Sequence, residues 1–371
     1  MGYVKKGNAS WYYVAEVGIN PVTGNRKRKK KSGFKTKREA ELALAQIETE
    51  VSHGSYVEPS NMLYKDYLLE WFKGKRNSIG EQTVVVYENI LNSRIIPSLG
   101  HFSLSKINAM YIQKYINSLK EEGLASATVK KIFEVIRNSL AHAKDLDIIP
   151  KNVAEKIKLP KDPKKEMEVW GEEEIKKFFE VAKNNRYFMA FYLAISTGMR
   201  QGEILGVCWK DIDFIDQSLC IKQTLKHDGK GFLVGGKTKS SNRTVALTSE
   251  TIVLLKRHRA MIAKEKLSKG GGYEDHDLVV CTEHGTPLNP ANLRRTFRRL
   301  ISQANIPEIK FHALRHTHAT LLLSKGVNVK VISERLGHSN IKVTLDVYSH
   351  VLPTMQEEAV KQIDNLLSSA K

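Results

Sequence analysis

FHALRHTHATLLLSKGVNVKVISERLGHSNIKVTLDVYSH, residues 311–350, gathers histidines, arginines and a tyrosine into one short stretch. His312 and Arg315 are three residues apart, which places them on one face of a helix. His338 directly follows Gly337, and glycine at that place is typical of a helix end. Tyr348 lies ten residues after His338. The stretch therefore supplies cationic donors and a nucleophilic hydroxyl.

A second motif, TGMRQGEILGVCWKDID at 197–213, lies upstream. The break at Gly198 predicts that Arg200 starts a helix, where exposed backbone amides favour an anion. Glu203 lies three residues further along the same helical face. An arginine and a glutamate at this spacing usually form a surface ion pair. This motif therefore indicates a functional site only in combination with the other motifs.

A third motif, GGKTKSSNRTVAL at 235–247, predicts a β-hairpin with lysines in its turn. A lysine in such a turn is usually solvated. Lys237 and Lys239 are two residues apart, which in a strand directs both side chains to one face. The sequence alone does not choose between them.

A metal site is the competing interpretation of the histidines. His312 and His316 have the i, i+4 spacing of helical zinc ligands. However, Ala313 stands where that motif needs a glutamate, Arg315 would repel a cation, and no nearby cysteine or carboxylate completes the shell. We therefore expect no metal and no cofactor.

Taken together, the candidate residues suit a phosphodiester. Guanidinium groups bind phosphate oxygens in pairs of hydrogen bonds, and imidazoles add further donors. A lysine can protonate a leaving oxygen, and a tyrosine can form a covalent phosphoryl ester. The candidate catalytic set is Arg200, Lys237, His312, Arg315, His338 and Tyr348.

The composition points the same way. The 371 residues predict two or three domains, and hydrophobic residues at 41% provide enough apolar surface for more than one core. Lysine and arginine exceed aspartate and glutamate by 19, an excess that indicates nucleic acid, although a solvated surface alone is the simpler alternative. The three cysteines are too scattered for disulfides and indicate a reducing compartment. We expect neither a membrane span nor a signal peptide.

The first of three blocks, residues 1–60, predicts a small α+β module with a three-stranded sheet and a helix. Strand 11–17 and a turn at 20–25 precede a basic strand. Thr36 and Glu39 form a capping box that opens a helix running to about Val51. A disordered tail or a nuclear signal would also explain the basic run, but its place between a turn and a cap favours a sheet that presents cations to a DNA groove. Its residues are Arg26, Lys27, Arg28, Lys29, Lys30 and Lys31.

The second block, residues 61–160, predicts a four-helix domain. Its second helix covers about 83–91 and ends before Pro97. Lys130, Lys131 and Arg137 lie off the apolar face of the last helix and are candidate DNA contacts, although simple solvation is the usual meaning of such charges. The third block, 166–371, is mixed α/β, with one strand expected at 219–225. Linkers are expected at 53–61 and 159–165. The whole chain is thus multidomain and mainly α-helical, with small β-sheets.

The order Arg, Lys, His-x-x-Arg, His, Tyr resembles the tyrosine recombinase, or phage integrase, family. TGMRQGEILGVCWKDID is similar to its first arginine box, and HALRHTHATLLLSKG with ISERLGHSNIKVTLDVYSHV is similar to its second. The resemblance implies that the first block binds arm-type DNA sites, the second binds the core site, and the third is catalytic. It further implies the integrase of a temperate phage or an integrative conjugative element.

The resemblance also implies roles. Tyr348 would attack the scissile phosphate and leave a 3′-phosphotyrosyl link, and strand exchange would pass through a Holliday junction. Arg200 and Arg315 would clamp the phosphate, with Glu203 as support. His312 and His338 would assist. Lys237 would protonate the 5′-oxygen, because its place before Thr238 resembles the Lys-Thr pattern of related integrases.

Partners follow from the resemblance as well. We expect double-stranded attachment sites, a homotetramer on DNA in synapsis, and an excision factor and a host DNA-bending protein as accessory partners. The expected location is the bacterial cytoplasm, at the nucleoid. Two alternatives remain open: a type IB topoisomerase shares this chemistry, and a DNA-binding regulator would have no catalysis. The regulator would not need the tyrosine.

Overall fold

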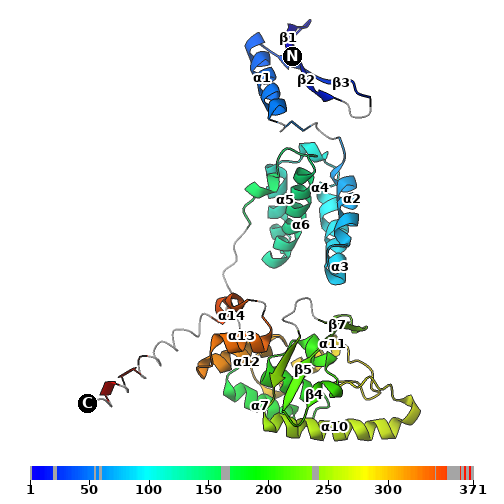
Figure 1. Cartoon of the computed structure of the whole chain (residues 1–371), viewed down its shortest axis with the longest axis vertical. Coiled ribbons are helices and arrows are strands. Elements are labelled where there is room, and N and C mark those ends of the chain that lie inside the picture. The colour runs from blue at the N-terminus through cyan, green and yellow to red at the C-terminus, as the bar shows by residue number, and fades with distance from the viewer. Residues whose placement is uncertain are drawn as a thin grey trace. The chain divides into compact units, whose positions relative to one another are not determined.

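The computed structural model describes residues 2–19, 23–53, 56–57, 61–159, 168–235, 242–338 and 340–348, together with 360, 363–364 and 367–368. The chain forms two compact units, Met1–Lys164 and Lys165–Lys371. Most of the chain in Figure 1 is helical, with small antiparallel sheets, which confirms the predicted fold class. The expected linkers lie partly outside the described residues.

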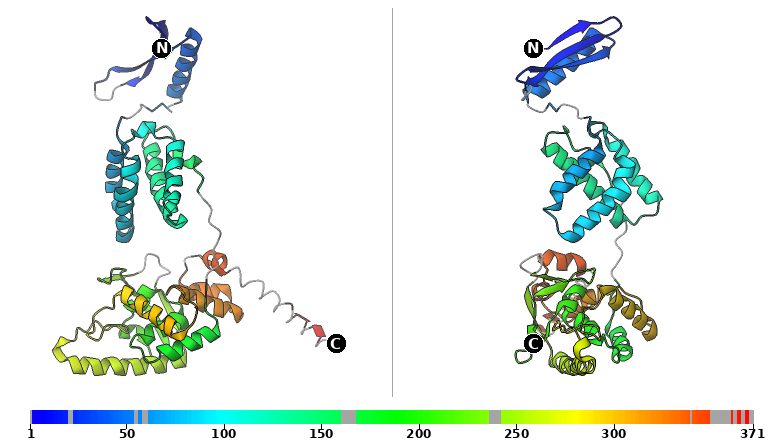
Figure 2. Two further views of the ribbon diagram at one scale, coloured as in Figure 1. Left: turned by 180° about the vertical axis from the view of Figure 1, so that it is seen from behind. Right: turned by 90° about the vertical axis from the view of Figure 1, so that its right-hand side faces the viewer.

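The chain begins with a three-stranded antiparallel sheet in the order β1-β2-β3, formed by Tyr3–Lys6, Trp11–Ile19 and Arg26–Phe34. Helix α1 (Lys37–Ser52) crosses one face of this sheet (Figure 2, right). Half of the predicted capping box is present: the Thr36 hydroxyl accepts from the Glu39 amide at 3.2 Å, but the Glu39 carboxylate accepts from the Lys35 amide, one residue before Thr36, at 3.0 Å. The small core between helix and sheet is formed by Tyr13, Ala15, Leu44 and Ile47.

Four helical stretches follow, as predicted. They comprise α2 (Tyr64–Arg76); α3 (Glu81–Ile90), continued by a π-helical turn (Leu91–Ile95) and α4 (Ile96–Leu99); α5 (Ala109–Glu121); and α6 (Ser126–Asp145). The prediction that the second helix stops before Pro97 was wrong in one respect. The helical path continues because the π turn shifts the hydrogen-bond register and Pro97 falls in the first turn of α4, where no amide donor is needed.

Eight helices of the second unit lie among the described residues. They are α7 (Glu172–Ala182), α8 (Phe188–Thr197), α9 (Gln201–Gly206), α10 (Ser249–Lys269), α11 (Pro290–Ala304), α12 (Ala313–Ser324), α13 (Val329–Leu336) and α14 (Ile341–Tyr348). Aromatic side chains fill the core between them. Phe297 of α11 stacks edge-on against Phe311 with ring centroids 5.5 Å apart, and against Phe178 at 5.4 Å. This packing fixes the start of α12.

The strands of this unit form two small sheets. One has the order β4-β5-β8 (Ile212–Asp213, Ser218–Ile221, Arg243–Ala246), and the other pairs β6 (Gln223–Leu225) with β7 (Phe232–Val234). The prediction of one strand over 219–225 was wrong. Lys222 interrupts it: its ammonium lies 2.8 Å from the buried Asp211 carboxylate, and its carbonyl accepts from the Gly235 amide. Residues 236–241 of the hairpin expected at 235–247 lie outside the described residues, and the strands on either side, β7 and β8, belong to different sheets.

Short 3-10 turns connect these elements, at Leu104–Lys106, Val153–Lys156, Trp209–Asp211 and Gly270–Gly272. Cys208 and Cys281 are buried and Cys220 is half-buried, and all three are free thiols. Over the residues that the structure describes, no helix is both long and apolar enough to cross a membrane.

Candidate active site

Helix α12 carries the most deeply buried candidate residue. Arg315 is 2% exposed, and its guanidinium donates to the Gly198 carbonyl at 2.9 Å and to the Leu336 carbonyl at 2.7 Å. A buried guanidinium with such backbone acceptors has a fixed orientation. His312 lies one turn earlier, at the exposed start of the helix. The predicted pairing of His312 and Arg315 on one helical turn is therefore present.

Arg200 caps the start of α9, as the Gly198 break predicts. Gly198 has a φ of 67°, and a Cβ at this position would lie 2.6 Å from both His318 and Leu336, so both the backbone conformation and the space require glycine. The Arg200 guanidinium donates to Glu203 at 2.8 Å, while 41% of the Arg200 side chain stays exposed. Arg200 is thus anchored by the carboxylate and still accessible to a ligand.

Helix α13 ends beside these arginines. Gly337 adopts the left-handed conformation with a φ of 67°, which terminates the helix as predicted and places His338 just beyond it. The His338 Nδ1 atom lies 2.8 Å from the hydroxyl of Thr344, which is fully buried in α14. Helix α14 ends at Tyr348. This connection links the histidine to the helix that carries the candidate nucleophile.

The surroundings of the two site histidines, His312 and His338, disfavour the charged form of each imidazole. Burial, together with the positive charges of Arg315 and Arg200, lowers the pKa of His338 to about 4. Desolvation, and then Arg315 and Arg200, also lower the pKa of His312. An anionic phosphate between these groups would raise both pKa values again, because it favours the protonated imidazole.

Arg243 was not predicted from the sequence, but the structure places it in the same cluster. Only 8% of its side chain is exposed, and its guanidinium donates to both carboxylate oxygens of Glu203, at 3.1 and 2.9 Å. No sequence pattern separates Arg243 from the chain's other arginines, since its burial arises from the packing of β8 against α13. Glu203 is therefore shared by Arg200 and Arg243.

His318 and Arg335 form a hydrogen-bonded pair beside the site, and no sequence pattern predicts this pair either. His318 is 5% exposed; its Nδ1 lies 2.7 Å from the Ile195 carbonyl, and its Nε2 lies 3.2 Å from the Arg335 Nε. A carbonyl needs a donor and an arginine needs an acceptor, so His318 must be neutral with the proton on Nδ1. Accordingly, burial and Arg335 lower the pKa of His318 to about 4.

Two of the predicted catalytic residues fall outside this geometry. Lys237, like its neighbour Lys239, lies outside the described residues. For Tyr348 the structure gives the helical backbone, and its side chain is outside what is described.

His312 and His316 are the pair that the zinc interpretation would use, and their rings meet edge to face with centroids 5.0 Å apart. Across the described ranges, no group of three His, Cys, Asp or Glu side chains could hold a metal ion.

The basic strand β3 divides its side chains between two faces. Arg28 pairs with Glu16, and Lys30 pairs with Val14, on the face that α1 leaves open. Lys29 is paired with Ala15, whose side chain points to the helix, and Lys31 is paired with Tyr13, which does the same. Strand alternation then puts Arg26 on the open face and Lys27 on the helix side.

The open face of this sheet is both aromatic and cationic. The Lys30 ammonium lies 4.3 Å from the centre of the Tyr12 ring, and Arg26 and Arg28 lie 3.3 and 3.7 Å from the Glu16 carboxylate. In α6, the other candidate DNA contacts Lys130, Lys131 and Arg137 are all exposed. Their position off the apolar face is as predicted.

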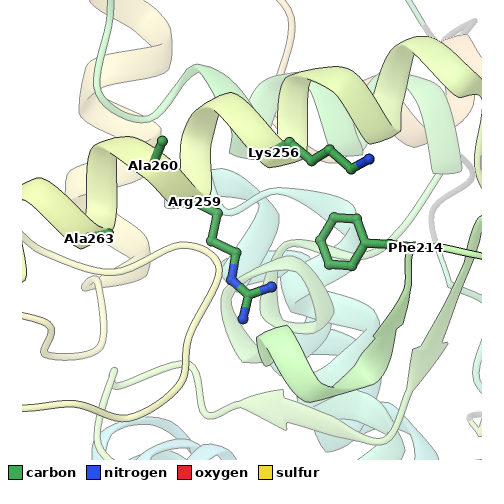
Figure 3. A pocket seen from close by; sticks show the side chains of 5 residues that line it. All are labelled: Phe214, Lys256, Arg259, Ala260 and Ala263. Atoms are coloured by element: carbon green, nitrogen blue, oxygen red, sulfur yellow. The ribbon is translucent and has the colours of Figure 1, made fainter.

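One recess of the second unit lies outside the candidate site. Figure 3 shows it lined by Phe214, Lys256, Arg259, Ala260 and Ala263. The Arg259 guanidinium carbon lies 5.6 Å from the Trp209 ring and 5.8 Å from the Phe214 ring, so cation–π stacking occupies this side chain. The recess contains none of the candidate catalytic residues.

Three family models match the chain in succession. They are an arm DNA-binding domain over residues 2–51, an N-terminal SAM-like domain of phage integrases over 63–120, and the phage integrase family over 168–355. A tyrosine recombinase XerC-like protein of Caldanaerobacter subterraneus subsp. tengcongensis is 35% identical, covering 98% of each chain. The ICEBs1 integrase of Bacillus subtilis is 28% identical over 99% of this chain and all of its own.

Among solved structures, the Tn1549 transposon integrase in complex with a circular intermediate DNA shares the fold. The match has a TM-score of 0.69 at 19% identity and covers 80% of this chain and 99% of that one. With the geometry above, these similarities show that the chain belongs to the phage integrase family of tyrosine recombinases. It is accordingly an enzyme of site-specific recombination that breaks and rejoins DNA, of the kind that integrates mobile elements.

Proposed function

We propose that Tyr348 is the nucleophile and that Arg200 and Arg315 hold the scissile phosphate. The observation that carries this proposal is the junction at the end of α13. Arg315 donates to its last helical carbonyl, Arg200 reaches Gly337, and His338 connects through Thr344 to α14, which ends in Tyr348. This arrangement supports a phosphate site formed by the starts of α9 and α12 and the C-terminus of α13. Residues 166–371 are the proposed catalytic domain.

In the proposed reaction, the Tyr348 oxygen attacks phosphorus and forms a phosphotyrosyl bond as the bond to the 5′-oxygen breaks. His312 accepts the tyrosine proton: burial and then the arginines disfavour its charged form in the free site, and the phosphate between these groups offsets that effect and favours the imidazolium that forms. His338 donates a hydrogen bond to the phosphate. Lys237 gives a proton to the departing 5′-oxygen. The 5′-hydroxyl of a partner strand then reverses these steps, which joins the new strands through a Holliday junction.

Covalent capture tests the nucleophile. On a core-site duplex with a nick beside the cleavage position, cleavage releases a short fragment that carries the free 5′-hydroxyl. This fragment diffuses away, so the strands cannot be rejoined, and the covalent protein–DNA adduct accumulates and is detected on a denaturing gel. Tyr348→Phe keeps the ring and removes the attacking oxygen, so binding should persist while the adduct disappears. The matched control is Tyr273→Phe, a change at a tyrosine of the same unit whose hydroxyl lies 3.7 Å from the Cys281 sulfur, and this variant should still form the adduct. An adduct with Tyr348→Phe would exclude the assignment.

The choice between Lys237 and Lys239 needs a chemical test. A substrate whose bridging 5′-oxygen is replaced by sulfur releases a thiolate, which leaves without a proton. Lys237→Ala should slow cleavage of the ordinary duplex and recover on the sulfur substrate. Lys239→Ala should only weaken binding in a salt-dependent way. Recovery for Lys239→Ala alone would move the role to that lysine.

The first two blocks are the proposed DNA-binding domains: residues 1–60 for arm-type sites and 61–160 for the core site. The open, cationic face of the β1-β2-β3 sheet supports the first, and the exposed basic residues of α6 support the second. We further propose a homotetramer at synapsis, an excision factor and a host bending protein as partners, and action in the bacterial cytoplasm at the nucleoid. Crosslinking on paired attachment-site DNA tests the tetramer: species no larger than a dimer would contradict it.

A further inference from the structure

Three consecutive backbone carbonyls, the last two of α13 and that of Gly337 directly after it, each accept a hydrogen bond from a different arginine. Arg243 donates to the Arg335 carbonyl at 2.7 Å, Arg315 to the Leu336 carbonyl at 2.7 Å, and Arg200 to the Gly337 carbonyl at 3.4 Å. Carbonyls at a helix C-terminus lack partners within the helix and form its negative end. The end of α13 therefore sets the three guanidinium groups in a fixed order.

Arg243 also holds the carboxylate that supports Arg200. Glu203 Oε1 accepts from Arg200 Nη1 at 2.8 Å and from Arg243 Nη1 at 3.1 Å. Its Oε2 accepts from the Arg200 backbone amide and from Arg243 Nη2, both at 2.9 Å. All three guanidinium nitrogens of Arg243 are thus engaged within the protein, and its side chain is almost entirely buried.

We propose that Arg243 is a positioning residue of the recombination reaction, which acts on the phosphate through Glu203 and Arg200 without contacting DNA. This inference rests on the proposed role of Arg200. With Arg243 present, Glu203 divides its oxygens between two arginines and leaves part of the Arg200 guanidinium available. Without it, the buried carboxylate keeps one guanidinium partner and draws Arg200 away from the phosphate.

The chain offers a matched control in Arg186. This arginine also makes a two-point ion pair in the same unit: its Nε and Nη2 donate to the two oxygens of Glu265 at 2.9 and 2.6 Å. Its other acceptors include the carbonyls of Cys281 and Thr282. None of these partners is a candidate catalytic residue, so Arg186 shares the chemistry of Arg243 without its link to Arg200.

The experiment measures adduct formation by the full chain on a nicked core-site duplex at saturating protein, with the dissociation constant and thermal midpoint measured beside it. Arg243→Gln should slow adduct formation by about 10–10²-fold, the usual cost of removing a partner that orients a ligand-binding group, with a dissociation constant within about threefold. Arg243→Lys, which keeps the charge but not the planar fork, should lose about tenfold or less. Arg186→Gln should lower the thermal midpoint and leave the rate within about threefold.

A neutral substrate separates positioning from a general loss of structure. Replacing a non-bridging oxygen of the scissile phosphate with a methyl group removes the charge that Arg200 stabilises. The loss caused by Arg243→Gln should therefore shrink on this methylphosphonate, and Arg200→Lys/Arg243→Gln should be no slower than Arg200→Lys alone. Equal losses on both substrates, multiplicative losses in the double variant, or a normal rate for Arg243→Gln would overturn the proposal. The Tyr348→Phe measurement stands apart, since it tests the nucleophile whatever Arg243 does.

Discussion

Arginine and lysine serve two purposes in this chain, and the β3 strand and the α13 junction show the difference. On the open face of β3 the cations Arg26, Arg28 and Lys30 are exposed, and the two arginines share the Glu16 carboxylate. At the α13 junction, Arg243 and Arg315 are buried and bonded to backbone carbonyls. Exposed charges attract DNA over a distance that salt limits, whereas buried guanidiniums define a position.

The largest expected effect comes from the buried set. Arg315→Lys keeps the charge but loses the two-point geometry that the Gly198 and Leu336 carbonyls fix. Adduct formation at saturating protein should fall by about 10²–10³-fold, the usual cost of one well-placed donor. Arg200→Lys should behave alike. Near-normal cleavage by either variant would mean that the arginine is only structural.

Substitutions on the exposed face of β3 should lower the affinity for DNA and leave the rate of cleavage unchanged. Arg28→Gln/Lys30→Gln neutralises two cations on the open face, so the slope of log K against log salt should fall by roughly 2. Cleavage of a core-only duplex should not change. The control is Lys37→Gln, a change at an exposed lysine of α1 paired with Glu41. An unchanged slope in the double variant would remove the open face from the DNA interface.

A smaller effect concerns pH. His318 is neutral in the folded protein with a pKa of about 4, whereas the unfolded chain binds its proton near pH 6.5. The unfolded state therefore binds more protons as the pH falls, and stability is lost on acidification. Between pH 7 and pH 5 this should cost roughly 1–2 kcal/mol.

His318→Asn tests this account, because an amide here can still donate to the Ile195 carbonyl and takes up no proton between pH 7 and pH 5. The variant should be less stable at pH 7 and should lose less stability between pH 7 and pH 5 than the natural chain, as measured by urea unfolding. His284→Gln, a change at an exposed histidine, serves as the control. The same pH slope in all three proteins would contradict the neutral His318.

The smallest effect is expected at α6. Lys130→Gln removes one exposed charge from the proposed core-site domain, and the salt slope should drop by about 1 with little change in the rate of cleavage. Glu134→Gln, a change at an exposed acidic residue of the same helix, should leave the salt slope unchanged or steepen it slightly. An unaltered slope for Lys130→Gln would show that Lys130 is only solvated and does not contact DNA.

Local signals were enough for much of the fold. Thr36 and Glu39 marked a helix start, Gly337 marked a helix end, and Gly198 placed Arg200 at the start of α9, because caps and left-handed glycines depend on neighbouring residues only. The interruption of the strand at Lys222 could not be predicted, since it depends on Asp211, a partner on another element. Such tertiary contacts have no local pattern.

The candidate site shows the same division. His312, Arg315 and His338 could be chosen from motif spacing, and the structure brings them to the α13 junction with Arg200. Arg243 could not be chosen, because only the folded chain reveals that its guanidinium meets Glu203 and the end of α13. The exposed β3 cations were found as a group, but the sheet register was needed to separate Arg28 and Lys30 from Lys29 and Lys31.

The most direct test of the two uses of arginine measures rate and affinity together on one full attachment-site duplex. Arg315→Lys and Arg28→Gln/Lys30→Gln are compared with the natural chain over a salt series. We expect the first variant to lose rate at saturating protein with an unchanged salt slope, and the second to lose slope with an unchanged rate. The reverse pattern, or one in which both variants lose rate and slope alike, would contradict the division between a positioning set and an attracting set.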